Sequence, residues 1–191
     1  APNAFATGRN PKNAVVAVTT GLLQTLNRAE LEGVIAHELS HIGNHDILIQ
    51  TIVVVLVGAI SMIADIFIRG RLFGRKSNNN NEGGQAGAIL MVIGLIFMIL
   101  SPIIAKLIQL AISRKREYLA DASGSLLTRY PVGLADALEK ISQNPNQLKH
   151  INKATAHLYI ANPKKKKKIS NLFSTHPPIE ERIKRLREMS V

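Results

Sequence analysis

The chain has 191 residues, a formal net charge of +11 and no cysteine. Without cysteine it can form neither a disulfide framework nor a thiolate zinc site, so histidines and carboxylates must hold any bound metal. The positive charge would suit nucleic acid or an anionic membrane surface. Only 4% of the residues are aromatic, and we find no nucleic-acid-binding motif, so we expect no nucleic-acid partner.

The first part of the chain predicts one strand and one helix. NAVVAVTTGLL, residues 13–23, is rich in β-branched residues and should form a strand that ends in a turn at Gly21. The next segment, LNRAELEGVIAHELSHIG, should be helical from Asn27, which has Glu30 three residues later in a capping-box pattern. Gly43 then indicates the end of this helix or a bend in it.

Two apolar blocks dominate the middle of the chain. The first, residues 47–68, would be about 33 Å long as a helix, which suits a hydrocarbon core of about 30 Å. The second runs from residue 86 to residue 112. A polar segment rich in turn-forming residues separates them and predicts a loop over residues 69–87. We therefore predict a transmembrane hairpin over residues 47–112, rather than a pair of buried helices in a soluble core.

The hairpin determines which parts of the chain share one side of the membrane. It returns the chain to the side that it left, so residues 1–46 and 113–191 are predicted to form one discontinuous domain. Most lysines and arginines belong to these two segments, and the positive-inside rule then favours a cytoplasmic position. The predicted fold class is mainly α (α+β), with a small N-terminal β region interrupted by the two-helix transmembrane hairpin.

Three segments after the hairpin have recognisable patterns. Residues 113–130 should be helical until Pro131, and residues 132–142 should form a short second helix. IEERIKRLREM, residues 179–189, is amphipathic and follows two prolines, which predicts a C-terminal helix. The lysine run at residues 164–168 is expected to be a solvated loop, with attraction to anionic lipid as the alternative.

The segment HELSH, residues 37–41, matches the pattern H-E-x-x-H. Residues four apart share one face of a helix, so His37 and His41 can hold one metal ion together. Glu38 lies beside a ligand without being one, which suits a general base. His45 is about 12 Å from His37 along a straight helix and could bind the same ion only if the chain bends. The alternative is a surface helix that carries two histidines by chance.

A catalytic zinc ion needs a third protein ligand and an open position. In one known arrangement a histidine six residues after the second supplies this ligand, but Ile47 occupies that position here. Glu117 is the alternative, because it follows the second apolar block about as closely as His41 precedes the first. Asp121 shares the helix face of Glu117 and could accept a hydrogen bond from a ligating histidine. Otherwise both carboxylates would belong to a solvated, ion-paired surface.

Three separated motifs resemble one protein family. HELSH, SRKREYLADASG after the hairpin, and STHPPIEERIKRL near the end are similar to the HtpX-like membrane zinc metalloproteases, which are related to the Ste24 and Oma1 proteases. The resemblance covers almost the whole chain. It implies a zincin-type metalloprotease domain with one zinc ion on His37, His41 and Glu117 and with Glu38 as the catalytic base. It also implies further membrane spans before Ala1, so we expect the chain to lack the N-terminal spans.

The resemblance implies an integral, multi-pass membrane endopeptidase of a prokaryotic inner membrane, with its catalytic domain in the cytoplasm. Its expected partners are misfolded or membrane polypeptides as substrates, and membrane lipids. His176 precedes a proline, which favours an extended loop, and is the candidate to stabilise the oxyanion. Arg182 could share that role or support the loop, and Tyr118 is another candidate.

Two other functions compete with this hypothesis. The first is a basic, membrane-anchored adaptor with a closed structural or vestigial zinc site. Such a site needs four protein ligands, and His45 or Asp46 would have to be the fourth. The second is a prenyl-directed endopeptidase like Ste24. An intact Glu38 argues for catalysis, because a structural site has no use for a base there.

Overall fold

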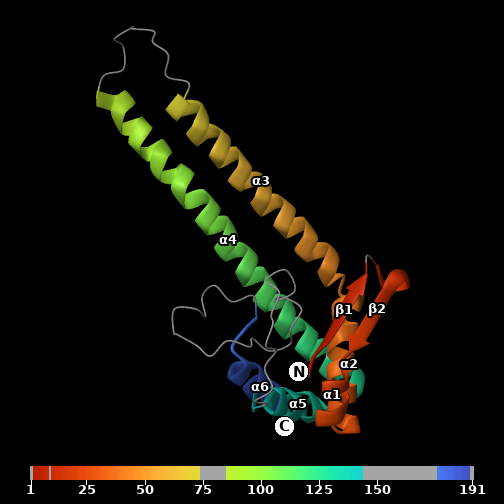
Figure 1. The fold of residues 1–191 in the computed structure, drawn as a ribbon. Coiled ribbons are helices and arrows are strands. Elements are labelled where there is room, and N and C mark those ends of the chain that lie inside the picture. Colours follow the sequence, from red (N-terminus) through yellow and green to blue (C-terminus); the bar gives the residue numbers. More distant parts are fainter. Residues whose placement is uncertain (1, 9, 74–84, 144–175, 190–191) are drawn as a thin grey trace. The chain divides into compact units, whose positions relative to one another are not determined.

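The computed structural model describes residues 2–8, 10–73, 85–143 and 176–189. It confirms the predicted fold class, since helices predominate and one small sheet lies near the N-terminus (Figure 1). The chain divides into two compact units. The first comprises Ala1–Gln50 and Leu110–Val191, and the second, the hairpin unit, comprises Thr51–Gln109.

A two-stranded antiparallel sheet begins the first unit. Strand β1 (Ala4–Gly8) pairs with β2 (Ala14–Val18), and Gly8 lies opposite Ala14. A 3-10 turn over Pro11–Asn13 joins the strands. The second strand lies within the predicted one, whereas no local pattern indicates a strand over residues 4–8.

The strand predicted over residues 13–23 is too long. Helix α1 (Thr20–Thr25) begins where we expected the turn at Gly21. The cause is Thr19, whose hydroxyl oxygen accepts a hydrogen bond from the backbone N–H of Leu22 and caps the new helix. Gly21 is therefore the second residue of a helix and does not form a turn.

Helix α2 (Arg28–Gly43) carries the HELSH segment and starts with the predicted capping box. The Asn27 side chain accepts from the backbone N–H of Glu30 at 3.0 Å, and the Glu30 carboxylate accepts from the Asn27 N–H at 2.9 Å. Lys140 of helix α5 (Pro131–Gln143) makes a 2.7 Å ion pair with the same carboxylate. The start of α2 is thus fixed both by its cap and by α5.

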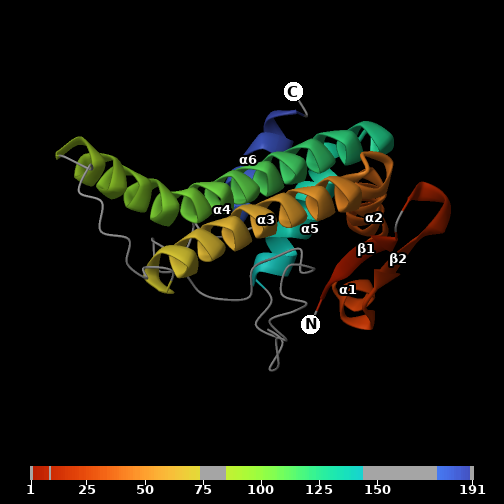
Figure 2. The ribbon, with the colours of Figure 1, turned by 90° about the horizontal axis from the view of Figure 1, so that it is seen from above.

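Helices α3 (Asp46–Phe73) and α4 (Gln85–Thr128) contain the two apolar blocks. Both contain a stretch that is long and apolar enough to cross a membrane, within Asp46–Ile66 and within Gly94–Thr128, and only 6% and 11% of their apolar windows are buried. Such exposed helices are unlike the core of a soluble protein and fit a membrane protein. Within the hairpin unit they run along each other in both views (Figures 1 and 2).

The helices also correct two boundaries. α3 continues to Phe73 and α4 already begins at Gln85, so both helices extend into the segment that we expected to be a loop. The second apolar block and the helix predicted over residues 113–130 are one continuous helix. Residues 74–84, and with them most of the predicted loop, lie outside the described residues. The same holds for the lysine run and for His150 and His157, two histidines without a partner motif that we expect at the surface.

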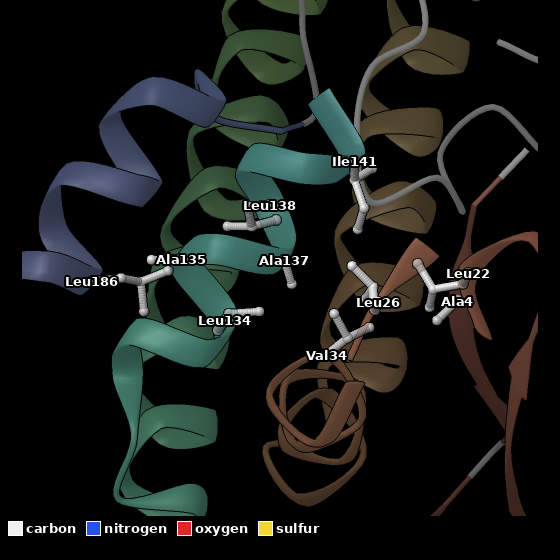
Figure 3. Packing of buried hydrophobic residues seen from close by; sticks show 10 residues of the cluster. All are labelled: Ala4, Leu22, Leu26, Val34, Leu134, Ala135, Ala137, Leu138, Ile141 and Leu186. Carbon is white, nitrogen blue, oxygen red and sulfur yellow. The ribbon is translucent and has the colours of Figure 1, made fainter. Parts of the chain in front are cut away.

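The hydrophobic core of the first unit packs α2, α5 and α6 (Ile179–Glu188) together with α1 and β1 (Figure 3). Its buried residues are Ala4, Leu22, Leu26, Val34, Leu134, Ala135, Ala137, Leu138, Ile141 and Leu186. Burying each leucine contributes about 1.5–3 kcal/mol. The core therefore holds α2 and α6 against α5, and both α2 and α6 contribute side chains to the site described next.

Candidate metal centre

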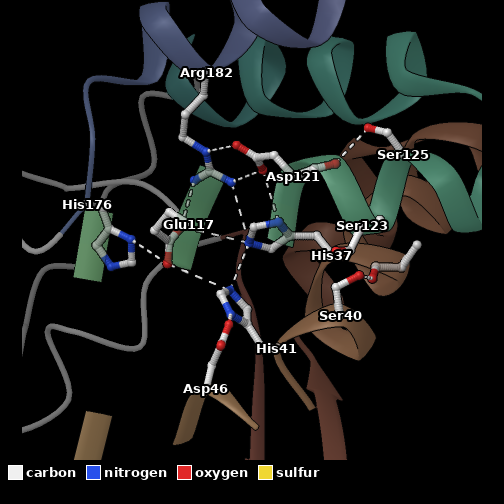
Figure 4. A network of polar contacts seen from close by, with 12 residues as sticks. His37, Ser40, His41, Asp46, Glu117, Asp121, Ser123, Ser125, His176 and Arg182 are labelled. Atoms are coloured by element: carbon white, nitrogen blue, oxygen red, sulfur yellow. Dashed lines mark hydrogen bonds and ion pairs between the residues drawn. The ribbon is translucent and has the colours of Figure 1, made fainter. Parts of the chain in front are cut away.

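His37, His41 and Glu117 lie together where α2 faces α4 (Figure 4). The Nε2 atoms of the two histidines are 3.1 Å apart. Oxygen atoms of Glu117 lie 3.8 Å from His37 Nε2 and 3.7 Å from His41 Nε2. Ligand atoms around a tetrahedral ion at about 2.0–2.1 Å are about 3.3–3.4 Å from one another. The three donors therefore fit a zinc-sized ion after small adjustments.

The second ring nitrogen of each histidine faces a carboxylate. His41 Nδ1 lies 2.6 Å from Asp46 Oδ2. His37 Nδ1 lies 3.0 Å from Asp121 Oδ1, close enough for a charge contact although not aligned as a hydrogen bond. A carboxylate beside Nδ1 favours the tautomer with the proton on that nitrogen. Both Nε2 atoms are then acceptors, and Arg182 Nη2 lies 3.4 Å from that of His37.

Arg182 of α6 is almost completely buried beside two carboxylates of α4. It donates to Asp121 from Nε at 2.8 Å and from Nη2 at 2.6 Å, and its Nη1 lies 3.2 Å from Glu117 Oε2. Burial by itself would lower the pKa of Arg182, but Asp121 and Glu117 hold it above its ordinary value. Arg182 therefore stays charged and fixes both carboxylates in place.

Glu117 and Asp121 stay ionised although they are buried beyond the apolar part of α4. Burial by itself would raise the pKa of Glu117, but His176, Arg182 and His37 hold it well below its ordinary value. Burial would likewise raise the pKa of Asp121, whereas Arg182 and His37 keep it below its ordinary value. An ionised carboxylate is the form that binds a metal.

The remaining candidates from the sequence take different positions. His176 lies at the cluster, with Nδ1 3.3 Å from Glu117 Oε1. Glu38 is buried, and its charge acts on Arg182. Tyr118 points to α6 instead, where the guanidinium of Arg185 lies 4.0 Å from the centre of its ring. Tyr118 thus helps to attach α6 and is not part of the cluster.

The sequence profile of peptidase family M48 matches residues 1–190. The chain belongs to peptidase family M48. This result confirms the resemblance to HtpX-like proteases that the three motifs indicated.

Curated M48 relatives match the chain over nearly its whole length. The "Protease HtpX homolog" of Dictyoglomus turgidum is 54% identical over 98% of the chain, and that of Thermoanaerobacter pseudethanolicus is 52% identical over 100% of it. The Streptococcus uberis protein of the same name is 52% identical over 98% of the chain. The chain spans 60%, 63% and 64% of the lengths of these relatives, in that order. No solved structure matches it significantly.

Asp46 has a different place in this M48 chain from the one that sequence reasoning considered. It was a possible fourth ligand, but its carboxylate faces His41 Nδ1 and the guanidinium of Arg116. Asp46 thus meets His41 at Nδ1 and not at Nε2, and it does not belong to the cluster of His37, His41 and Glu117. The signal in the sequence was an acidic residue directly after the HELSH helix, since a ligating histidine needs an acceptor.

His45, the other possible fourth ligand, is exposed and lies outside the cluster. Its backbone has a left-handed φ of 55°, which ends α2 and turns the chain into α3. Its side chain lines a small groove that also includes His41, Gly8 and Ala14. α2 ends at Gly43 as expected, and the left-handed turn at His45 brings Asp46 rather than His45 next to His41.

Gly124 lets α4 approach the backbone of α2 at His37. A Cβ at Gly124 would lie 2.9 Å from His37 N and 3.0 Å from His37 Cα. Gly124→Ala should therefore separate the two helices, cost about 1–3 kcal/mol of stability and weaken zinc binding. Gly43→Ala is the matched control, because a Cβ there meets nothing within 4 Å. Thermal unfolding and a zinc titration measure both effects, and equal zinc binding by the two variants would contradict this account.

Proposed function

We propose that this chain is the catalytic part of a membrane-anchored, zinc-dependent endopeptidase. The proposal rests on the cluster of His37, His41 and Glu117, which offers three ligand atoms within 4.8 Å of one another. Two histidines and one carboxylate are a known donor set for catalytic zinc, with a further position left for water or substrate. Membership of family M48 and the names of the relatives, which call them proteases, support proteolysis.

We assign the protease domain to residues 1–46 and 113–191 and the transmembrane hairpin to residues 47–112. The long, exposed apolar helices support this assignment. The positive-inside rule favours a cytoplasmic protease domain in a multi-pass protein of the inner membrane. Membrane lipids are then the partners of the hairpin, and misfolded or membrane proteins are the substrates.

The residues in and around the cluster would have different roles in hydrolysis. A bound zinc ion supplies a water of lowered pKa and polarises the scissile carbonyl. Glu38 would take the proton of the attacking water and pass it to the leaving amine. His176 would donate a hydrogen bond to the developing oxyanion. Arg182 is engaged by Asp121 and Glu117, so we assign it to holding these carboxylates rather than to the substrate.

Substrate would bind as an extended chain along the small sheet. Within the described residues the sheet has two strands, so each strand has one edge that its partner does not occupy, and residues 14–19 are the candidate edge for substrate. The ends of both strands, at Gly8 and Ala14, line the groove that also contains His41. Backbone pairing with a sheet edge tolerates many side chains, so we expect broad specificity. A substrate panel that reveals one strict cleavage sequence would contradict this mode of binding.

Removal of the metal tests the proposed function. We expect a chelator to abolish cleavage of an unfolded protein by the full-length protein in detergent, and added zinc to restore it. Glu117→Gln should bind zinc more weakly, because the neutral amide is a poorer ligand than the carboxylate.

Stoichiometric zinc without cleavage of any unfolded substrate would instead favour the adaptor with a closed site. That alternative requires a fourth protein ligand. The contacts of Asp46 with Arg116 and His41 Nδ1, and the exposure of His45, argue against both residues in that role.

A further inference from the structure

We propose that Asp46 and Arg116 form a positioning pair that holds His41 in the orientation needed to bind the metal. The proposal rests on the proposed zinc site and assigns roles to two residues outside its three ligands. Asp46 is buried, and its Oδ2 lies 2.6 Å from His41 Nδ1. Its other oxygen, Oδ1, contacts the guanidinium of Arg116. The Asp46 carboxylate therefore connects the His41 ring to the guanidinium of Arg116.

Arg116 is itself held in place by the backbone. Its Nη2 donates to the carbonyl oxygen of Asn44 at 2.6 Å. Asn44 caps the C-terminal end of α2, where carbonyl groups lack partners within the helix and a cation is favourable. The one guanidinium group thus contacts both the C-terminal end of α2 and the Asp46 carboxylate at the start of α3. Its rigid fork suits two simultaneous contacts of this kind.

The backbone between these residues supports a specific role for Asp46. His45 adopts a left-handed conformation with φ of 55°, which costs a residue other than glycine about 1–2 kcal/mol. The turn places Asp46 in the first turn of α3, where a negative charge is favourable, and directs its carboxylate back towards α2. A strained backbone conformation persists only where surrounding contacts hold it, and such residues cluster at functional sites.

The two ligating histidines are supported in parallel but from different helices. His37 faces Asp121, which Arg182 of α6 holds, while His41 faces Asp46, which Arg116 of α4 holds. Arg116 precedes the ligand Glu117 in the sequence. One turn of α4 therefore supplies the third ligand and also, through Asp46, the orientation of the second. The pair makes the end of α2, the start of α3 and α4 a single support for His41.

Asp46→Asn in the full-length protein is the direct test. Asparagine keeps the size and an acceptor oxygen but loses the charge that favours the proton on His41 Nδ1. We expect zinc affinity, measured by competition with a chelator, to fall by about 10–100-fold. The absorption spectrum of the cobalt-loaded protein should also change, because it reports the geometry of the ligands. Asp136→Asn is the matched control, since Asp136 is an exposed carboxylate of the same unit that pairs only at the surface of α5.

A second variant keeps the test decisive if Asp46→Asn does not fold. Arg116→Lys retains the charge but loses the fork, so its zinc affinity should fall below that of the wild type. All titrations are made well below the unfolding temperature, so that a loss of stability alone does not change them. Wild-type zinc affinity in whichever of the two variants folds would overturn the positioning role and leave the proposed function intact. Absence of zinc binding by the wild type would overturn the proposed function itself.

Discussion

Replacement of Glu38 by glutamine is expected to lower the rate of peptide-bond cleavage by about 10²–10⁴-fold, which is the usual contribution of a general base. Glutamine has nearly the same shape but cannot accept a proton from water. Glu38 is not among the three clustered candidate ligands, so zinc content should stay unchanged. The measurement compares the cleavage of an unfolded protein and the bound zinc for the full-length wild type and Glu38→Gln.

Glu32→Gln is the matched control for this experiment. It makes the same chemical change on the same helix, but Glu32 is exposed and pairs only with Arg28 at the surface. Its cleavage rate should equal that of the wild type. Equal rates for Glu38→Gln and the wild type, with equal zinc, would show that the proton is accepted elsewhere or that the cleavage comes from a contaminant.

The second large effect is expected for Arg182→Met. Methionine fills a similar volume but leaves the buried carboxylates of Asp121 and Glu117 without their cation. Removal of one partner from a buried ion pair typically costs about 3–5 kcal/mol. We expect a loss of that size in the free energy of unfolding of the metal-free protein, measured by denaturant titration of the full-length protein in detergent.

Arg187→Met provides the comparison within the same helix. Arg187 forms ion pairs with Asp136 and Glu139 at the surface, and exposed pairs contribute about 0–1 kcal/mol. Its unfolding free energy should therefore stay within about 1 kcal/mol of the wild type. Similar small losses for both arginine variants would mean that water reaches the Arg182 network and that its burial does not determine stability.

Local patterns in the sequence were sufficient for the parts of the fold that short-range forces determine. The capping box at Asn27 and Glu30, the end of α2 at Gly43 and the two long apolar helices follow from neighbouring residues, and the structure has all of them. Glu117 is the predicted third ligand because the hairpin returns the chain to the side of the membrane on which His37 and His41 lie, at a similar distance from the apolar blocks. The structure places it beside both histidines, although its role as a ligand stays a prediction.

The features that sequence reasoning missed depend on contacts between distant residues or on competing local caps. Strand β1 is too short and too poor in large apolar residues to be recognised without its partner. Helix α1 depends on one hydroxyl cap at Thr19, which outweighed the turn tendency of Gly21. The contact of Arg116 with Asp46 joins residues 70 positions apart, and no local pattern indicates which arginine meets which aspartate.

The buried polar network has an uneven balance of charge. Four carboxylates belong to it, those of Glu38, Asp46, Glu117 and Asp121, whereas Arg116 and Arg182 supply the positive charges. Counted without the histidines, which carry charge only when they are protonated, this leaves two negative charges uncompensated in a largely buried network. Uncompensated buried charge is costly, and one divalent cation is enough to make the whole network neutral. A divalent cation would supply this compensation while the histidine Nε2 atoms stay unprotonated, which is the form in which they bind a metal.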